Sequence, residues 1–123
     1  MLPASFNLPT LPLFISRVSA GFPSPADDYI ERRLNLEEYL VSHPAATFYL
    51  KAGRPYPALN ILADDLLVVD RSITPKAGHV VVVVESGELR MALIPPKSSE
   101  LEVWGVVRFV IHSMVGISHV RAD

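Results

Sequence analysis

The stretch from Ala20 to Asp70 decides the fold, and it reads AGFPSPADDYIERRLNLEEYLVSHPAATFYLKAGRPYPALNILADDLLVVD. Its second half holds two short runs, Thr47–Lys51 and Leu66–Asp70, whose β-branched, aromatic and aliphatic residues are typical of strands. Between them, Gly53-Arg54-Pro55-Tyr56-Pro57 combines a glycine with two prolines, a composition that marks a loop. This half of the stretch therefore predicts two strands and a proline-rich loop between them.

The sequence beyond Asp70 continues the strand pattern. Two apolar runs flank Glu85-Ser86-Gly87, which predicts a tight hairpin, and a valine-rich run follows with Gly105 as a bulge or bend. The predicted strands are His79–Val84, Glu88–Ile94 and Leu101–His112, with a loop at Pro95–Ser99. Many short strands and one small helix favour a mainly β domain, in the form of a curled sheet or a small barrel.

The N-terminal side of the stretch is rich in proline. Residues 1–25 hold five of the eleven prolines, which disfavours a helix because proline lacks the amide donor. We therefore expect an extended N-terminal arm over residues 1–25 and a β domain over residues 26–123. Tyr29–Leu34 favours a short strand, and Asn35 with Glu38 forms a capping-box-like pattern that predicts one short helix at residues 36–42.

Composition narrows the classes of function. The chain has 123 residues, enough for one domain with its own core. Its 11 basic and 13 acidic side chains give a net charge of −2, so we expect no direct nucleic-acid binding. The absence of cysteine excludes disulfides and thiol catalysis, and no cofactor is expected. The valine run Val80–Val84 is too short to span a membrane, and the N-terminus lacks the basic region of a signal peptide, so we expect a cytoplasmic protein.

Four segments, in this order along the chain, resemble the UmuD branch of the LexA-type self-cleaving serine peptidases. They are AGFPSPADDY from Ala20, ATFYLKA from Ala46, DDLLVVD from Asp64 and EVWGVVR from Glu102. The resemblance covers residues 10–112 and implies the LexA/UmuD-like, signal-peptidase-like β fold.

The same resemblance shows what this chain lacks. In the family, a G-D-S-M turn carries the nucleophilic serine and a V-K-x-L strand carries the lysine that acts as its base. Aligned from the strand before the loop, the serine position falls on Tyr56; aligned from the strand after it, the position falls on Pro55. The lysine position falls on Ala92, and the nearest lysine, Lys97, lies beyond two prolines. Because the reaction needs a hydroxyl beside an uncharged amine, the resemblance implies that this chain is not an enzyme.

Two N-terminal segments resemble functional parts of the UmuD arm. Ala20 and Gly21 match the bond that the family cuts in itself, although Gly21 is equally explained as a residue that allows a bend. Cleavage of this bond by an active relative is one hypothesis. Upstream, a segment resembles the part of the UmuD arm that has been linked to the replicative sliding clamp. Its candidate clamp-binding or partner-binding residues are Leu11, Pro12, Leu13 and Phe14.

The other polar residues have structural interpretations. Asp65 and Asp70 are expected to shape turns, His43 suits a helix end, and His112 is expected to be a packed or edge residue. Ser72, Ser86, Ser98 and Ser99 fall in predicted turns, and metal binding is not expected because the histidines lack ligand spacing. The region Trp104–Val110 is expected to be core, with a dimer interface as the alternative.

The resemblance implies a non-catalytic, UmuD-like accessory or regulatory subunit for a Y-family translesion DNA polymerase in the SOS response. The expected partners are a second copy or a UmuD-type subunit, the polymerase, a RecA filament and the sliding clamp. Two alternatives remain open: a decoy that heterodimerises with an active UmuD and blocks it, and a residual serine autopeptidase.

Overall fold

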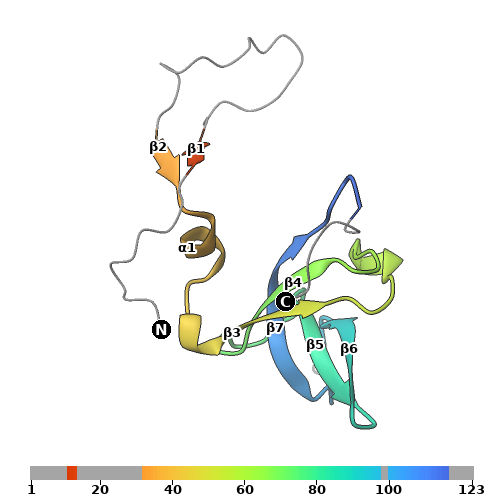
Figure 1. Cartoon of the computed structure of the whole chain (residues 1–123). Helices are drawn as coiled ribbons and strands as arrows, with labels where there is room; N and C mark the ends of the chain where they lie inside the picture. Colours follow the sequence, from red (N-terminus) through yellow and green to blue (C-terminus); the bar gives the residue numbers. More distant parts are fainter. Residues whose placement is uncertain (1–10, 14–31, 98–99, 117–123) are drawn as a thin grey trace. The chain divides into compact units, whose positions relative to one another are not determined.

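The structure is a computed structural model that describes residues 11–13, 32–97 and 100–116 (Figure 1). The chain divides into two compact units, Met1–Tyr39 and Leu40–Asp123. Strands dominate the described residues, with one short α-helix, so the predicted mainly β class is confirmed. The predicted boundary after residue 25 falls outside the described residues and stays a prediction.

In the first unit, β1 (Leu11–Leu13) pairs antiparallel with β2 (Arg32–Leu34), which lies within the strand predicted at Tyr29–Leu34. Helix α1 (Leu36–Leu40) follows, and the Asn35 side chain accepts a hydrogen bond of 3.0 Å from the Glu38 amide, the predicted cap. The helix ends at Leu40, two residues before the predicted end. A helix this short has little cooperative support, and the chain turns instead into a 3₁₀ turn that begins at a proline, Pro44–Ala46.

The second unit contains one five-stranded antiparallel sheet in the order β3-β4-β7-β5-β6 (Figure 1). β3 and β4 have the bounds that the sequence predicted, and the other three strands differ from their predicted bounds by one or two residues. The strands are β3 (Thr47–Lys51), β4 (Leu66–Asp70), β5 (Val80–Glu85), β6 (Glu88–Leu93) and β7 (Val103–Ile111).

The predicted hairpin joins β5 to β6 through a two-residue turn. Ser86 and Gly87 both have positive φ angles, 53° and 78°, and their neighbours Glu85 and Glu88 face each other across the ladder. Positive φ at both turn residues is the geometry that matches the twist of a hairpin, and glycine adopts it without steric cost.

β7 lies in the middle of the sheet and contains two bulges. Val82 pairs with Gly105 while Val83 pairs with Val103, so the intervening Trp104 is an extra residue next to the predicted bulge at Gly105. A second register shift, opposite the Val68–Val69 step of β4, makes Arg108 extra.

The valine runs form the core. Val81, Val82 and Val83 are at most 1% exposed, and they contribute to clusters on both faces of the sheet. Val106 is buried on the same strand that holds the partly buried Trp104. The prediction that Trp104–Val110 belongs to the core is therefore confirmed for this part of β7. The end of the strand is more exposed to solvent, since Val110 is 38% exposed. Among the described residues, no helix is long and apolar enough to cross a membrane.

Candidate functional site

The loop between β3 and β4 is held closed at two levels. At its base, the Ala52 amide donates to the Asp65 carbonyl at 2.9 Å, and the Asp64 amide donates to the Ala52 carbonyl at 2.7 Å. Further out, Tyr56 and Ile61 form an isolated antiparallel bridge around a 3₁₀ turn, with Ile61 fully buried. The proline-rich loop is thus a fixed turn that presents Tyr56 at a defined place.

This loop and the end of β6 line one groove of about 490 Å³. Pro55 and Tyr56, the two residues predicted for the serine position, line it from the loop. Ala92, the residue predicted for the lysine position, lines it from β6. The structure therefore brings together the residues that the resemblance singled out, although they lie about 36 residues apart in sequence.

The Tyr56 hydroxyl is held by a neighbouring cation. Arg54 Nε donates to Tyr56 Oη at 3.3 Å, and the guanidinium carbon lies 5.2 Å from the centre of the Tyr56 ring. The hydrogen bond from Arg54 lowers the pKa of Tyr56 and outweighs burial, which would raise it. Arg54 is a hydrogen-bond donor here, so it does not serve as a base for the phenol.

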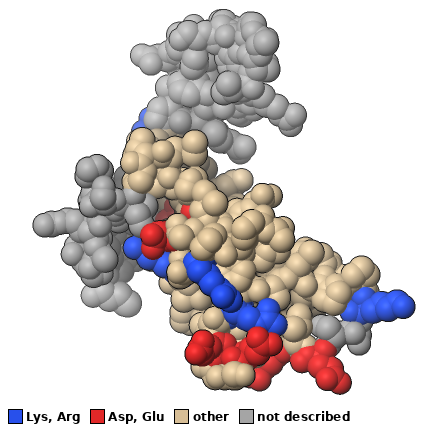
Figure 2. Space-filling model, turned by 90° about the vertical axis from the view of Figure 1, so that its right-hand side faces the viewer, with Lys and Arg blue, Asp and Glu red and all other residues tan. Residues whose placement is uncertain are grey.

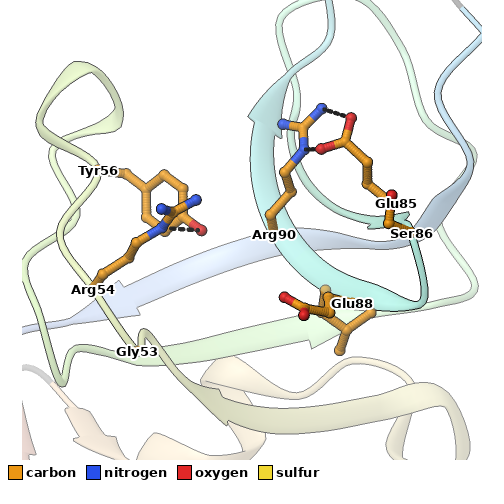
Figure 3. A pocket seen from close by; sticks show the side chains of 8 residues that line it. Gly53, Arg54, Tyr56, Glu85, Ser86, Glu88 and Arg90 are labelled. Atoms are coloured by element: carbon orange, nitrogen blue, oxygen red, sulfur yellow. Dashed lines mark hydrogen bonds and ion pairs between the residues drawn. The ribbon is translucent and has the colours of Figure 1, made fainter.

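Tyr56 and Arg54 also line a polar cleft of about 540 Å³ beside the β5–β6 hairpin (Figure 3). Across this cleft, Arg90 binds Glu85 through two hydrogen bonds, of 2.6 and 3.1 Å. The ion pair lowers the pKa of Glu85 and raises that of Arg90. Basic and acidic side chains lie next to one another on the face shown in Figure 2. Such a cleft is suited to holding charged or polar groups of a partner.

Two histidines pair with buried carboxylates, a feature that the sequence did not predict. His43 Nδ1 lies 2.6 Å from Asp70 Oδ2, and His112 Nδ1 lies 2.7 Å from Asp65 Oδ1. Asp70 is fully buried and Asp65 is 3% exposed. The expected role of His43 at a helix end is wrong, because α1 ends three residues earlier and the ring contacts Asp70 instead.

Both aspartates also shape turns, as expected. Asp65 Oδ2 accepts from the Leu62 amide at 2.9 Å, and Asp70 Oδ1 accepts from the Ser72 amide at 2.8 Å. Ser72 Oγ donates to the same Asp70 oxygen at 2.6 Å. The aspartate therefore lies between Ser72 and His43, whereas nucleophilic catalysis needs the base in contact with the hydroxyl.

The structure gives Asp70 a defined effect on pH stability. Burial raises the pKa of Asp70, but the hydrogen bonds from Ser72 and His43 outweigh it and leave this pKa below its ordinary value. A lowered folded-state pKa means that Asp70 adds stability above its unfolded pKa of about 4, and that this contribution is lost as the pH falls through the folded-state pKa.

We therefore expect Asp70→Asn to cost about 1–3 kcal/mol at pH 7, because its buried hydrogen bonds are weakened. The parent should then lose more stability than the variant between pH 5 and pH 2, as urea unfolding across this range would show. Asp64→Asn is the matched control, since Asp64 is exposed at a left-handed position that asparagine tolerates. Equal losses of stability on acidification in parent and Asp70→Asn would contradict the assignment.

The N-terminal candidates are only partly described. Leu11, Pro12 and Leu13 form β1, with Leu11 70% exposed. Phe14, Ala20 and Gly21 lie outside the described residues, so their predicted roles stay predictions. Ser98 and Ser99 also lie outside them. Among the described residues, no group of three or more histidine, aspartate and glutamate side chains could hold a metal ion.

The sheet and the groove define the class of protein: a β domain of the LexA/UmuD-like peptidase fold. The chain matches the model of the Peptidase S24-like family over residues 12–95. This chain belongs to that family, as a UmuD-like member.

Relatives match most of the chain. Protein SamA of Salmonella typhimurium is 38% identical over 120 residues, which cover 84% of this chain and 86% of SamA. Protein ImpA of Escherichia coli is 41% identical over 120 residues, covering 82% of this chain and 83% of ImpA. A LexA repressor of Thiobacillus denitrificans is 41% identical over 69 residues, covering 55% of this chain and 34% of the repressor.

Proposed function

We propose that this protein is a non-catalytic, UmuD-like accessory or regulatory subunit that supports a Y-family translesion DNA polymerase in the SOS response. It acts by binding other proteins in the cytoplasm, as a homodimer or as a heterodimer with a UmuD-type subunit. Family membership and the long matches to SamA and ImpA support the accessory role. The polymerase, a RecA filament and the sliding clamp are the partners that the family resemblance suggests.

One observation carries the non-catalytic part of this proposal. The residues that the resemblance predicts at the family's two catalytic positions, Pro55 or Tyr56 and Ala92, line the same groove. The methyl group of Ala92 cannot accept a proton. The Tyr56 hydroxyl is bound by donors, the Arg54 guanidinium and the Met91 backbone amide, and neither of them can act as a base. A nucleophile without a base in contact is not activated.

A decoy that heterodimerises with an active UmuD and blocks it is the second candidate. The length of the matches supports it, because the match to SamA covers 84% of this chain and 86% of SamA. A subunit that keeps the family's fold can keep its pairing surface as well. The two roles predict opposite effects on damage-induced mutagenesis: an accessory subunit raises it and a decoy lowers it.

The frequency of damage-induced mutation in two bacterial strains distinguishes the two roles. In cells that lack a UmuD-type subunit but express the partner polymerase, the accessory role predicts that the frequency of damage-induced mutation rises when this chain is expressed. In cells with an active UmuD, a decoy lowers mutagenesis instead. Val82→Asp is the control, because a charge at a 1% exposed core position abolishes folding. No change in either strain would contradict both roles.

A further inference from the structure

The polar cleft beside the β5–β6 hairpin is built from two fixed parts of the second unit. The β3–β4 loop contributes Arg54 and Tyr56, and the hairpin contributes Glu85, Glu88 and Arg90 (Figure 3). The loop is closed by backbone hydrogen bonds and the hairpin by its ladder, so these charged and polar side chains are mounted on a defined backbone. The volume of the cleft, about 540 Å³, lies in the range of about 300–1,000 Å³ that is usual for binding sites.

Two of the four charged side chains in this cleft neutralise each other. Arg90 Nε and Nη2 donate to the two carboxylate oxygens of Glu85, at 2.6 and 3.1 Å. A paired guanidinium and carboxylate of this kind have satisfied each other's strongest hydrogen bonds. Arg90 and Glu85 therefore contribute little net charge to the recognition of a ligand.

The other two charged side chains, Arg54 and Glu88, are exposed and are not paired in this way. Over the part of the chain that the structure describes, neither of them forms an ion pair. The pKa of Arg54 is raised chiefly by its hydrogen bond to Tyr56, and the charge of Glu88 makes the smallest contribution. One cation on the loop and one anion on the hairpin thus line the same cleft without neutralising each other.

Arg54 and Tyr56 together are suited to a carboxylate. Arg54 uses Nε to donate to Tyr56 Oη at 3.3 Å, and the remaining N–H groups of its guanidinium can bind an acceptor. The Tyr56 hydroxyl accepts from Arg54 and from the Met91 amide, so its own proton can be donated. The planar guanidinium matches the geometry of a carboxylate, and the phenol adds a second kind of donor beside it.

We propose that this cleft is a docking site for a segment of a partner protein that carries an acidic and a basic side chain close together. The acidic side chain binds the Arg54 guanidinium and the Tyr56 hydroxyl, and the basic side chain binds the Glu88 carboxylate. Complementary charges of this kind set the identity and the orientation of a partner more than its affinity. The inference deepens the proposed function and rests on it, since it names the chemistry of a partner for a protein that acts by binding.

Titration of the full chain with a short peptide, followed by NMR, tests the docking site. The probe is an acetylated and amidated glycine-rich peptide with one glutamate and one lysine, and the reporters are the amides of Gly53 and Ser86, which line the cleft. Replacing the glutamate of the peptide by glutamine should weaken its binding to the parent chain by about fivefold, the upper end for an exposed ion pair. The same replacement should change binding to Arg54→Gln by less than about twofold, because the partner of the glutamate is gone.

The basic side chain is tested in the same way. Replacing the lysine of the peptide by glutamine should weaken binding to the parent, again by about fivefold, and should have less than about a twofold effect on binding to Glu88→Gln. Arg71→Gln is the matched control, because it removes a guanidinium that lies outside the cleft and donates to the Trp104 carbonyl. This variant should bind all the peptides as the parent does.

Three results would overturn the docking site: no shift of the Gly53 and Ser86 amides, equal effects of the glutamate replacement in the parent and in Arg54→Gln, or equal shifts with inorganic phosphate at the same concentration. The last result would identify a site for small anions instead. Native mass spectrometry of the parent with a UmuD-type subunit separates this inference from the proposed function. A chain that assembles but does not bind the peptide overturns the docking site alone, whereas a chain that binds the peptide but does not assemble counts against the proposed function alone.

Discussion

Gly105→Ala should lower the melting temperature by roughly 5–20 °C, and Gly105→Val should prevent folding. A Cβ at Gly105 would lie 2.6 Å from Val69 Cγ1 and 3.2 Å from Arg71 Cγ. Val69 is fully buried and stiff at χ1, so it cannot move aside without disturbing β4. Overpacking of this kind costs about 1–3 kcal/mol for one methyl group, and each kcal/mol shifts the midpoint of a domain this size by about 4–8 °C.

Thermal unfolding followed by circular dichroism measures this effect. Gly53→Ala is the control, since a Cβ there meets no atom within 4 Å and the backbone does not need glycine. Its melting temperature should stay within about 2 °C of the parent. Equal shifts for the two alanine variants would show that the close approach of β7 to β4 is not as described.

Self-cleavage should be absent, and Tyr56→Phe should leave the chain as stable toward cleavage as the parent. Tyr56 is the one hydroxyl placed opposite Ala92 among the residues that line the groove, so removing its oxygen tests whether it replaces the serine. Losing the nucleophile of a serine protease costs on the order of 10⁶ in rate, and the resemblance predicts that the base position of this chain holds Ala92. Intact mass after incubation at alkaline pH measures the cleaved fraction.

A UmuD-type relative that keeps both catalytic residues is the positive control for these conditions. A parent chain that is cut while Tyr56→Phe is not would identify Tyr56 as a nucleophile and contradict the proposal. Cutting of both at equal rates would point to another group in the chain.

The strands were predictable because each one is marked by the residues of its own short segment. Thr47–Lys51 and Leu66–Asp70 are short runs of β-branched, aromatic or aliphatic residues between turn signals, and the structure places β3 and β4 at those bounds. The hairpin was predictable for the same reason, because Ser86-Gly87 suits positive φ. The order of the strands in the sheet was not predictable. β7 lies between β4 and β5, and no local sequence pattern determines which strands pair.

The groove and the long-range polar contacts show the same division between what was predictable and what was not. Motif resemblance predicted that Tyr56 or Pro55 and Ala92 occupy matching positions, and the fold brings them to one groove. No motif linked His43 to Asp70 or Arg108 to Leu40, because 27 and 68 residues separate the partners. Such contacts depend on register and on the bulge at Arg108, which arise only when β4 and β7 pair.

Native mass spectrometry of the pure chain, held at alkaline pH for several days, reports both cleavage and association in one spectrum. We expect intact chains of 13.5 kDa that assemble with one another or with an added UmuD-type subunit. A fragment that begins at Gly21, formed with no other protein present, would contradict the proposal that this protein is non-catalytic.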